Sequence, residues 1–404
     1  MTVPKKYILT INGGSSSIKF AVYAIDNVPE RQWHGQLDRI GQSGTSLVVS
    51  DASGDQRASN PFRSISFGSV AAPVHDYSEA IAFLIDWLEG ETVFENIQAV
   101  GHRVVHGMER TEPERITPNL LTELRGIIPI DPDHLPGEIT LIELIQSRYP
   151  GLLQIACFDT AFHRTLPRVA QLLPIPRRFD EQGIRRYGFH GLSYTYLLSE
   201  LSRIAGIDTA DGRLILAHLG SGASLAAVRR GKSMDTTMGF TPTGGIMMGT
   251  RPGDLDPGTM AYLMQMEELT PTQFNHLINQ ESGLLGVSET SSDIRALLAS
   301  QATDSRAAEA VDLFCYQIKK GIGAFAAVLD GVDTLVFSGG IGENVAETRA
   351  LICAGLGFLG IDIDYHRNIA NAAIISTDTS RVTVRIIPTD EEQIVAKFVL
   401  TFIS

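Results

Sequence analysis

Apolar residues recur along the chain at spacings that predict alternating strands and helices. Residues 7–11 and 18–25 are β-prone and flank a turn at 12–17 that is rich in glycine and serine. Apolar side chains at positions 81, 84, 85 and 88 have the i, i+3, i+4, i+7 spacing of a helix over 78–89. The remaining elements expected in the first half are short β-like pieces within 41–72, a strand at 99–105, a helix at 137–147 and a strand at 152–157.

The second half opens in the same order, with a strand at 213–219, a Gly/Ser turn at 220–224 and a strand at 225–229. This repeated opening is a weak internal repeat, and it predicts two α/β domains of related fold with a boundary near residues 150–165. The later elements expected are a helix beginning at 256–257, a helix at 305–329, a strand at 333–337, a glycine-rich turn at 338–344, a helix at 345–354, a strand at 382–387 and a final helix over 391–401 capped by Thr389 or Asp390.

Composition narrows the class of protein. The 404 residues are 44% hydrophobic and 20% charged, which is ordinary for a soluble globular chain. The net charge of -13 argues against a general binder of nucleic acids or membranes, because both partners are polyanionic. Three well-separated cysteines, Cys157, Cys315 and Cys353, indicate no disulfide framework and a reducing compartment. No apolar run is long enough to span a bilayer, so a cytoplasmic location is expected.

The first candidate for chemistry is the turn from Asn12 to Ser17, followed by Lys19. Glycines in such a turn let backbone N–H groups approach an anion closely. In an extended chain Ser15, Ser17 and Lys19 project to one face, where two hydroxyls and an ammonium suit a phosphate. A plain hairpin turn with polar surface residues is the alternative. The sequence lacks the Walker A spacing.

The second turn, His218 to Ser224, repeats this arrangement at the start of the second half. One Gly-Ser-Gly is usually only a turn, but two such turns in facing domains could hold one triphosphate between them. A third glycine run, Ser338 to Asn344, is expected between a strand and a helix. There it could admit an anion or a flat base, or serve only as a tight connection.

Two arginines extend this picture. Arg103 and Val105 share one face of the strand at 99–105, which would suit a short carboxylic acid with its carboxylate on the guanidinium and its alkyl end on the valine. A solvent-exposed arginine on an edge strand is the alternative. Arg251 lies in a glycine-rich loop, where it could neutralise a transferring phosphoryl group. Nearby Asp254 and Asp256 invite a metal interpretation, but Asp256 is better explained as a helix cap.

Three further residues remain open on chemical grounds. Asp159 follows a strand end, the usual place for functional residues in α/β domains. His190 lies in a basic and aromatic loop, where it could stabilise charge or be a neutral loop residue. Glu391 begins the last helix, where a partner of the helix dipole is a simpler interpretation than a magnesium ligand.

Taken in order, these motifs resemble the acetate kinase (acetokinase) family, within the superfamily of acetate and sugar kinases, Hsp70 and actin. The resemblance covers nearly the full length. It is carried by these segments: 12–19, 101–107, 158–163, 186–191, 218–224, 238–257, 292–295, 337–344 and 388–392. It implies an α/β fold of two actin-like (ribonuclease H-like) domains, 1–160 and 161–390, with the helix 391–404 packing back on the first and a nucleotide cleft between them.

The resemblance also implies roles for individual residues. The catalytic set is Asp159, His190 and Arg251. The metal ligands in this family, for Mg²⁺ with Mn²⁺ as the alternative, are Asn12 and Glu391. The carboxylate would bind Arg103, with its methyl group in a pocket of Val105, Ile130, Phe189 and Pro242. The nucleotide contacts are Ser15, Ser17, Lys19, His218, Leu219, Gly220, Ser221, Gly222, Asp293, Ile294, Arg295, Gly340, Ile341, Gly342, Glu343 and Asn344.

The chain departs from the family pattern at several loops. The family's Pro-Leu-His-Asn-Pro is replaced here by residues 129–133, Pro-Ile-Asp-Pro-Asp, and the Gly-Thr-Ser-His after the histidine by Gly-Leu-Ser-Tyr at 191–194. Ser221 replaces an asparagine, and Thr243-Gly244-Gly245 replaces Leu-Glu-Gly. The core catalytic set is intact. The changed loop from Ile130 to His134 bears on which acyl chain is preferred and on nearby dimer contacts.

The expected activity is reversible, direct in-line transfer of the ATP γ-phosphate to acetate, giving acetyl phosphate and ADP. The resemblance also implies a homodimer that binds a small carboxylate and ATP and needs neither nucleic acid nor membrane. A propionate or butyrate kinase is the first alternative, since one methylene is worth only about 1–3 kcal/mol in an apolar pocket. A nucleotide-switched binding protein of the actin or Hsp70 type is the second.

Overall fold

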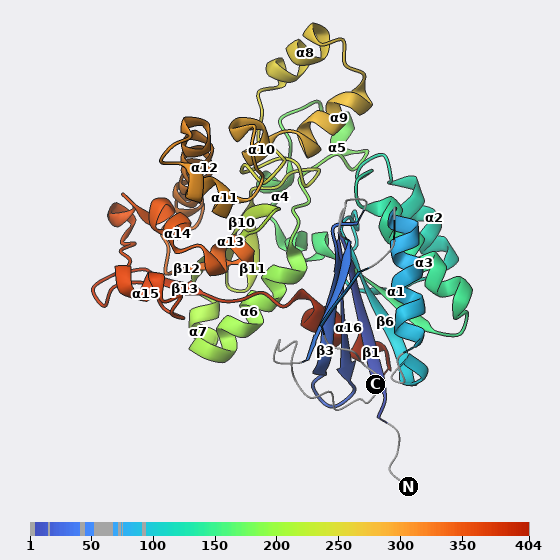
Figure 1. Ribbon diagram of the computed structural model, residues 1–404. Helices are drawn as coiled ribbons and strands as arrows, with labels where there is room; N and C mark the ends of the chain where they lie inside the picture. The colour runs from blue at the N-terminus through green and yellow to red at the C-terminus, as the bar shows by residue number, and fades with distance from the viewer. Residues whose placement is uncertain are drawn as a thin grey trace. The chain divides into compact units, whose positions relative to one another are not determined.

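The computed structural model describes residues 5–14, 17–40, 45–51, 68–71, 74, 76–90 and 94–403 (Figure 1). The chain divides into two compact units. The first unit comprises Met1–Ala161 and Asp390–Ser404, and the second comprises Phe162–Thr389. Within the described residues no helix is both long enough and apolar enough to cross a bilayer. The three cysteines are buried and free.

The first unit is built on a sheet of order β5-β4-β3-β2-β1-β6-β8-β7. At its centre, β1 pairs antiparallel with β2 and parallel with β6. The strands are β1 (Tyr7–Gly13), β2 (Ser17–Ala24), β3 (Glu30–Asp38), β4 (Ser46–Asp51), β5 (Gly68–Ala71), β6 (Ile97–Val104), β7 (Glu114–Arg115) and β8 (Leu153–Phe158).

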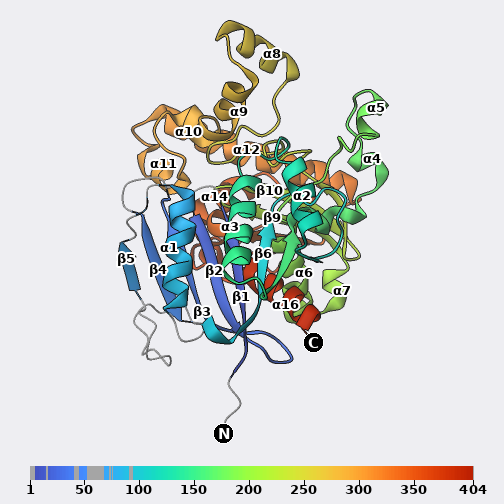
Figure 2. The same ribbon diagram turned by 90° about the vertical axis from the view of Figure 1, so that its right-hand side faces the viewer.

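Helices cover both faces of this sheet. On one face, α1 (Tyr77–Glu89) and α3 (Leu135–Arg148) pack on a core that includes Phe20, Trp33 and Ile81, and α2 (Pro118–Gly126) packs against α3 (Figure 2). On the other face, α16 (Glu391–Ile403) packs on β1 and β6. A Cβ atom at Gly101 would lie 2.4 Å from a methyl of Val395, so this glycine in β6 permits the close approach of the last helix.

The second unit repeats the central arrangement with a sheet of order β11-β10-β9-β12-β13. Here β9 pairs antiparallel with β10 and parallel with β12, as β1 does with β2 and β6. The strands are β9 (Arg213–Leu219), β10 (Ala223–Arg229), β11 (Lys232–Thr236), β12 (Thr334–Ser338) and β13 (Thr383–Ile386). The internal repeat seen in the sequence is thus a repeat of strand topology.

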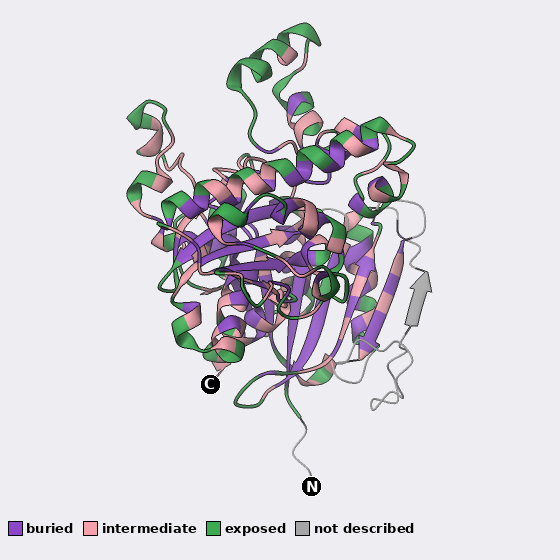
Figure 3. Cartoon of the chain, turned by 90° about the vertical axis from the view of Figure 1, so that its left-hand side faces the viewer, coloured by how far each residue is buried: buried purple, intermediate pink, exposed green. Residues whose placement is uncertain are grey.

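The helices of the second unit include long elements that pack on the sheet and short ones that connect loops. They are α4 (Arg168–Gln171), α5 (Arg177–Asp180), α6 (Gly191–Ala205), α7 (Ile207–Ala210), α8 (Pro257–Met266), α9 (Pro271–Gln280), α10 (Gly283–Ser288), α11 (Ile294–Ser300), α12 (Ser305–Val328), α13 (Gly339–Asn344), α14 (Ala346–Cys353) and α15 (Tyr365–Ile369). Helix α8 has no buried residue, whereas the strands are largely buried (Figure 3).

Two turns differ from the sequence expectation. The strand β10 begins at Ala223, so Ser224 lies in a buried strand and not in the turn. The glycine run after β12 is not a turn but the helix α13, so that prediction is wrong. Only Gly339 makes a tight connection: it has φ +76°, and a Cβ there would lie 2.6 Å from the carbonyl oxygen of Leu219. The Glu343 carboxylate accepts from the Gly339 N–H at 2.8 Å, which satisfies the new helix start.

Both expected caps are present. Asp256 accepts from the N–H of Gly258 at 2.6 Å, which leaves it a capping residue as predicted. Asp390, rather than Thr389, accepts from the N–H of Gln393 at 3.0 Å at the start of α16.

Candidate active site

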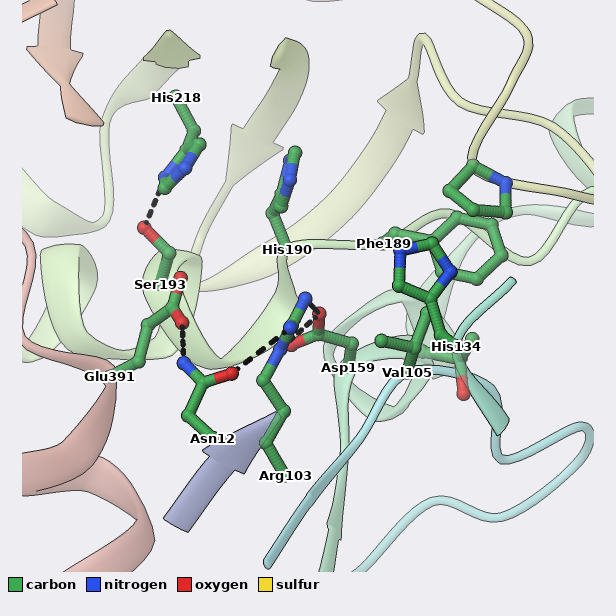
Figure 4. A network of polar contacts seen from close by, with 12 residues as sticks. Asn12, Arg103, Val105, His134, Asp159, Phe189, His190, Ser193, His218 and Glu391 are labelled. Carbon is green, nitrogen blue, oxygen red and sulfur yellow. Dashed lines mark hydrogen bonds and ion pairs between the residues drawn. The ribbon is translucent and has the colours of Figure 1, made fainter. Parts of the chain in front are cut away.

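The first unit brings four of the predicted site residues together around one guanidinium group. Arg103, on β6, donates from Nε to Asp159 Oδ2 at 2.9 Å and from Nη1 to Asn12 Oδ1 at 3.1 Å (Figure 4). Asn12, at the end of β1, donates from Nδ2 to Glu391 Oε2 at 2.9 Å. Because β1 and β6 are adjacent parallel strands, their carboxyl ends place Asn12 and Arg103 side by side.

Because this cluster is buried, the charged groups in it interact strongly. Asp159 is fully buried and the Arg103 side chain is 14% exposed, so their ion pair lies in a low-dielectric setting. Burial alone lowers the pKa of Arg103, but the carboxylates of Asp159, Glu391 and Glu138 raise that pKa above its ordinary value. The guanidinium is therefore a fixed cation. The solvent-exposed interpretation of Arg103 is wrong.

Val105 follows directly after β6 and is buried. Its N–H donates to both carboxyl oxygens of Glu138, each at 3.2 Å, and Glu138 is only 3% exposed. Burial, and then the nearby Asp131, raise the pKa of Glu138 well above its ordinary value. The Glu138 carboxyl group thus holds the Val105 backbone beside the predicted methyl pocket.

The changed loop before α3 adds a second acidic residue. Asp131 is 3% exposed and its Oδ1 lies 2.8 Å from Nδ1 of the half-buried His134, whereas its buried Oδ2 has no recorded partner. Ile130 is half-buried in the turn that precedes these residues.

The structure describes part of the first turn, which was predicted to bind phosphate. Lys19 is exposed on β2, directly opposite Asn12 in the strand register, and Ile18 and Phe20 point into the core. Ser17 is half-buried at the start of that strand and shares a face with Lys19. Ser15 lies outside the described residues.

In the second unit His190 occupies the position before α6 with a left-handed backbone, φ 60° and ψ 25°. Such a conformation in a non-glycine residue costs about 1–3 kcal/mol and is frequent at functional sites. His190 is 9% exposed, and its Nδ1 lies 2.8 Å from Ser224 Oγ. Its ring stacks on that of His218, with centroids 4.3 Å apart.

The turn from Leu219 to Gly222 lies against two of these groups. A Cβ atom at Gly222 would lie 3.0 Å from Arg251 Nη2 and 3.3 Å from His190 Nε2. The two side chains therefore both lie close to a position that only glycine leaves unfilled. His218 Nδ1 lies 2.8 Å from Ser193 Oγ (Figure 4). Ser221 is exposed and Gly220 is half-buried in the same turn.

Two residues predicted to line the methyl pocket also lie in the second unit. Phe189, 1% exposed, accepts at its carbonyl from His163 Nε2 at 3.1 Å. Pro242 is buried, and its carbonyl oxygen accepts from Arg251 Nη1 at 2.8 Å. Arg251 is thereby tied to the loop that carries Pro242.

The remaining nucleotide-binding candidates are spread over two helix starts of the second unit. Asp293 caps α11 by accepting from the Arg295 N–H at 2.9 Å, and its side chain pairs with that of Arg295 on the surface. Ile294 is 1% exposed and belongs to the core. In α13, Gly340 and Asn344 are exposed, Ile341 and Glu343 are half-buried, and Gly342 is buried.

Several polar residues at the site were not singled out by sequence reasoning: Glu138, Ser193, Tyr194 and Ser224. Ser224 and Tyr194 are fully buried, and Tyr194 Oη lies 2.5 Å from Ser224 Oγ. The signal available was the departure of residues 129–133 and 191–194 from the family pattern, since Tyr194 falls within the second of these and Glu138 follows the first.

These features define a class of protein: an α/β protein of two mixed sheets with a buried arginine–carboxylate cluster in one unit and a histidine–arginine pair at a glycine turn in the other. The family model for the acetokinase family matches residues 7–397. The chain belongs to the acetokinase family.

The relatives of this chain include acetate kinases and propionate kinases. The chain is 42% identical over 398 residues to an acetate kinase of Rhodopseudomonas palustris, covering 97% of each chain. It is 41% identical over 403 residues to a propionate kinase of Citrobacter rodentium, covering 97% of this chain and 96% of that one.

The solved structures that this chain resembles also include an acetate kinase and a propionate kinase. The crystal structure of Porphyromonas gingivalis acetate kinase matches with a TM-score of 0.84 and 36% identity, covering 99% of this chain and 100% of that one. A propionate kinase from Francisella tularensis matches with a TM-score of 0.86 and 32% identity, covering 97% and 98%. The predicted fold class, an α/β fold of two actin-like domains, is confirmed, and each unit contains a mixed sheet.

Proposed function

We propose that this chain is an ATP-dependent acetate kinase that forms acetyl phosphate and ADP by direct, reversible, in-line transfer of the γ-phosphate. The observation that carries the proposal is the buried guanidinium of Arg103, fixed by Asp159 and Asn12 next to Val105, in a member of the acetokinase family. The family uses a carboxylate and ATP as substrates, which argues for an enzyme over a nucleotide-switched binding protein.

The first unit supplies the carboxylate site in this proposal. Arg103 binds the acetate oxygens, and Asp159 holds the guanidinium in one orientation. Val105 and Ile130 are the residues of this unit assigned to the methyl group, and Phe189 and Pro242 are those assigned from the second unit. Acetate is ionised at neutral pH and attacks phosphorus without help from a strong base, so Asp159 acts on Arg103 or the metal.

The phosphoryl group is assigned to His190 and Arg251. Both present side-chain nitrogens next to a glycine turn, which suits charge that develops on phosphoryl oxygens in the transition state. The nucleotide itself is assigned to three sets of residues: 15, 17 and 19 with the turn 218–222; 293–295; and 340–344. Of the second set, Ile294 can contribute only its backbone, because its side chain is buried in the core.

A magnesium ion fits the donor chemistry of Asn12 and Glu391. Oδ1 of Asn12 and the carboxylate of Glu391 are hard oxygen ligands, and Mg²⁺ needs few protein ligands because it keeps several waters and phosphate oxygens. Within the described residues no group of three or more His, Cys, Asp and Glu side chains is placed to hold a metal ion. The ion would neutralise phosphate charge when bound, and Mn²⁺ has the same oxygen preference.

The test is acyl hydroxamate formation from ATP with acetate, propionate or butyrate. We expect acetate to give the highest kcat/KM, with propionate within about tenfold because one methylene discriminates weakly. Absence of any acyl phosphate, or ATP turnover independent of acid, would contradict the proposal.

Propionate is the second candidate for the preferred acid. Propionate kinases resemble this chain as closely as acetate kinases do, at 41% and 42% identity. Acetate being the poorest of the three acids would favour propionate or butyrate and would leave the phosphotransfer proposal intact.

We also propose a cytoplasmic homodimer. Free, buried cysteines suit a reducing compartment. The homodimer rests on the family resemblance, and light scattering of the purified protein measures it directly.

A further inference from the structure

A chain of three buried polar groups leads away from His190 inside the second unit. Nδ1 of His190 lies 2.8 Å from Ser224 Oγ, and Ser224 Oγ lies 2.5 Å from Tyr194 Oη. Ser224 and Tyr194 are both fully buried. His190 and Tyr194 are four residues apart at the start of α6, and the Tyr194 N–H donates to the His190 carbonyl at 3.0 Å, so one helical turn sets the spacing of the two side chains.

The direction of each hydrogen bond between these three side chains decides which ring nitrogen of His190 carries the proton. A neutral phenol has one O–H to donate, and a serine hydroxyl both donates and accepts. If Tyr194 donates to Ser224, the serine proton is free to point at Nδ1. Nδ1 then accepts, and a neutral imidazole must carry its proton on Nε2.

Two neighbouring groups of this unit disfavour a charged imidazolium. His190 precedes the first turn of the 15-residue helix α6, where the helix dipole presents its positive end. Arg251 Nη2 and His190 Nε2 both lie within 3.3 Å of the Cβ position at Gly222, so a fixed cation is close to the ring. The stacked ring of His218 adds no negative charge.

We propose that Tyr194 is a positioning residue that acts through Ser224 to hold His190 as a neutral imidazole with its proton on Nε2. This nitrogen is the one next to Arg251 and Gly222, so the relay turns His190 into a hydrogen-bond donor towards phosphoryl oxygens. The inference rests on the proposed function for the role of the donated proton, whereas the tautomer itself does not depend on any activity.

The first experiment reads the tautomer by two-bond ¹H–¹⁵N correlation spectra of the full-length protein with ¹⁵N-labelled histidine. The His190 signals are assigned with His190→Gln. We expect the neutral Nε2–H form near pH 7.5 in the wild type and a mixture of the two neutral tautomers in Tyr194→Phe. A wild-type His190 that is an imidazolium, or that is protonated on Nδ1, overturns the proposal. So does a tautomer ratio unchanged in Tyr194→Phe.

The second experiment asks whether the effect of Tyr194 on catalysis passes through His190. Tyr194→Phe should lower kcat by about tenfold and leave KM for acetate and ATP within about twofold, because one buried hydrogen bond is removed. In the His190→Gln background the same change should have no further effect, since the two residues act in one chain. An equal loss in both backgrounds shows a merely structural role and overturns the proposal.

Matched variants keep the result interpretable. Tyr196→Phe removes a hydroxyl from the same helix, but from a half-buried side chain packed against the core cluster to which Tyr194 belongs, and should leave kcat and the tautomer unchanged. If Tyr194→Phe does not fold, Ser224→Ala provides the same test from the middle of the relay. A wild type that makes no acyl phosphate contradicts the proposed function alone, because the spectra still decide the tautomer.

Discussion

The two units use the same backbone position for different chemistry. In the first, Asn12 is the penultimate residue of β1 and lies opposite Lys19 on the antiparallel neighbour. In the second, His218 is the penultimate residue of β9 and lies opposite Ser224. Around Asn12 the partners are ions, namely Arg103, Asp159 and Glu391. Around Ser224 they are hydroxyls and imidazoles. A repeated strand topology therefore carries an ionic cluster in one unit and a hydroxyl–imidazole network in the other.

Because of this difference, substitutions in the two units are expected to have different effects on stability and activity. Removing one member of a buried ion pair leaves the other charge uncompensated, which typically costs about 3–5 kcal/mol of stability. Removing one hydroxyl from a neutral network costs about 1–3 kcal/mol and mainly changes orientation. We therefore expect substitutions in the first unit to affect both folding and activity, and substitutions in the second to affect activity far more than folding.

The largest effect is expected for Arg103→Ala. The variant loses the carboxylate ligand and leaves the fully buried Asp159 without its cation. Hydroxamate formation with acetate should fall by about a thousandfold or more, and the free energy of unfolding in urea should fall by about 3–5 kcal/mol. The matched control is Arg125→Ala, which breaks an exposed pair with Glu143 and should change neither quantity appreciably. Acetate-dependent activity within tenfold of the wild type would contradict the role of Arg103.

Arg251→Ala tests the expectation that substitutions in the second unit affect activity more than stability. Because a transition-state donor is removed, kcat should fall by about 10²–10³-fold. Arg251 donates from Nη1 to the neutral carbonyl of Pro242 at 2.8 Å, so losing this bond should lower the melting temperature less than losing the buried ion pair of Arg103 and Asp159. The measurement is kcat together with a thermal melt. A large loss of stability with normal kcat per folded molecule would reverse the expected order.

A smaller effect is expected for Gly222→Ala. The backbone of Gly222 lies outside the left-handed region, but the new methyl would lie 3.0 Å from Arg251 and 3.3 Å from His190. Displacing these donors should lower kcat about tenfold with an unchanged melting temperature. Gly126→Ala, in a position where an added Cβ meets nothing within 4 Å, is the control. Wild-type kcat in Gly222→Ala would argue that the turn does not constrain the two side chains.

The smallest effect is a pH dependence in Glu138→Gln. The folded-state pKa of Glu138 is raised, mainly by burial, so its contribution to stability is complete below about pH 4.5 and is lost as pH rises through the folded pKa. Glutamine does not ionise. The stability of the variant relative to the wild type should therefore increase with pH, by at most about 1.4 kcal/mol per pH unit.

Urea unfolding of both proteins from pH 5 to 8 measures this trend. Glu143→Gln, on the exposed side of the same helix α3, should show a constant difference from the wild type over this range. A constant difference for Glu138→Gln as well would mean that Glu138 is ionised in the folded protein.

Part of the fold could be read from local pattern alone. The helix at 77–89 and the long helix at 305–328 carry strong apolar periodicity, and their bounds differ from the expectation by one residue at most. The strand β3 and the helix α6 were not expected. Both carry many polar residues, and their burial depends on partners far away in sequence: β3 on β2 and β4, and α6 on the strands of the second sheet.

The sequence by itself determined the α/β class, the glycine turns, the residue types at the site and, through ordered motifs, the family. Those properties depend on local spacing and on which residues occur at all. Only the tertiary structure decided that Arg103 is paired and buried, that Glu138 holds the Val105 backbone, and that Tyr194 reaches His190 through Ser224. Burial and hydrogen-bond partners arise when strands and helices distant in sequence pack together, and no local pattern encodes them.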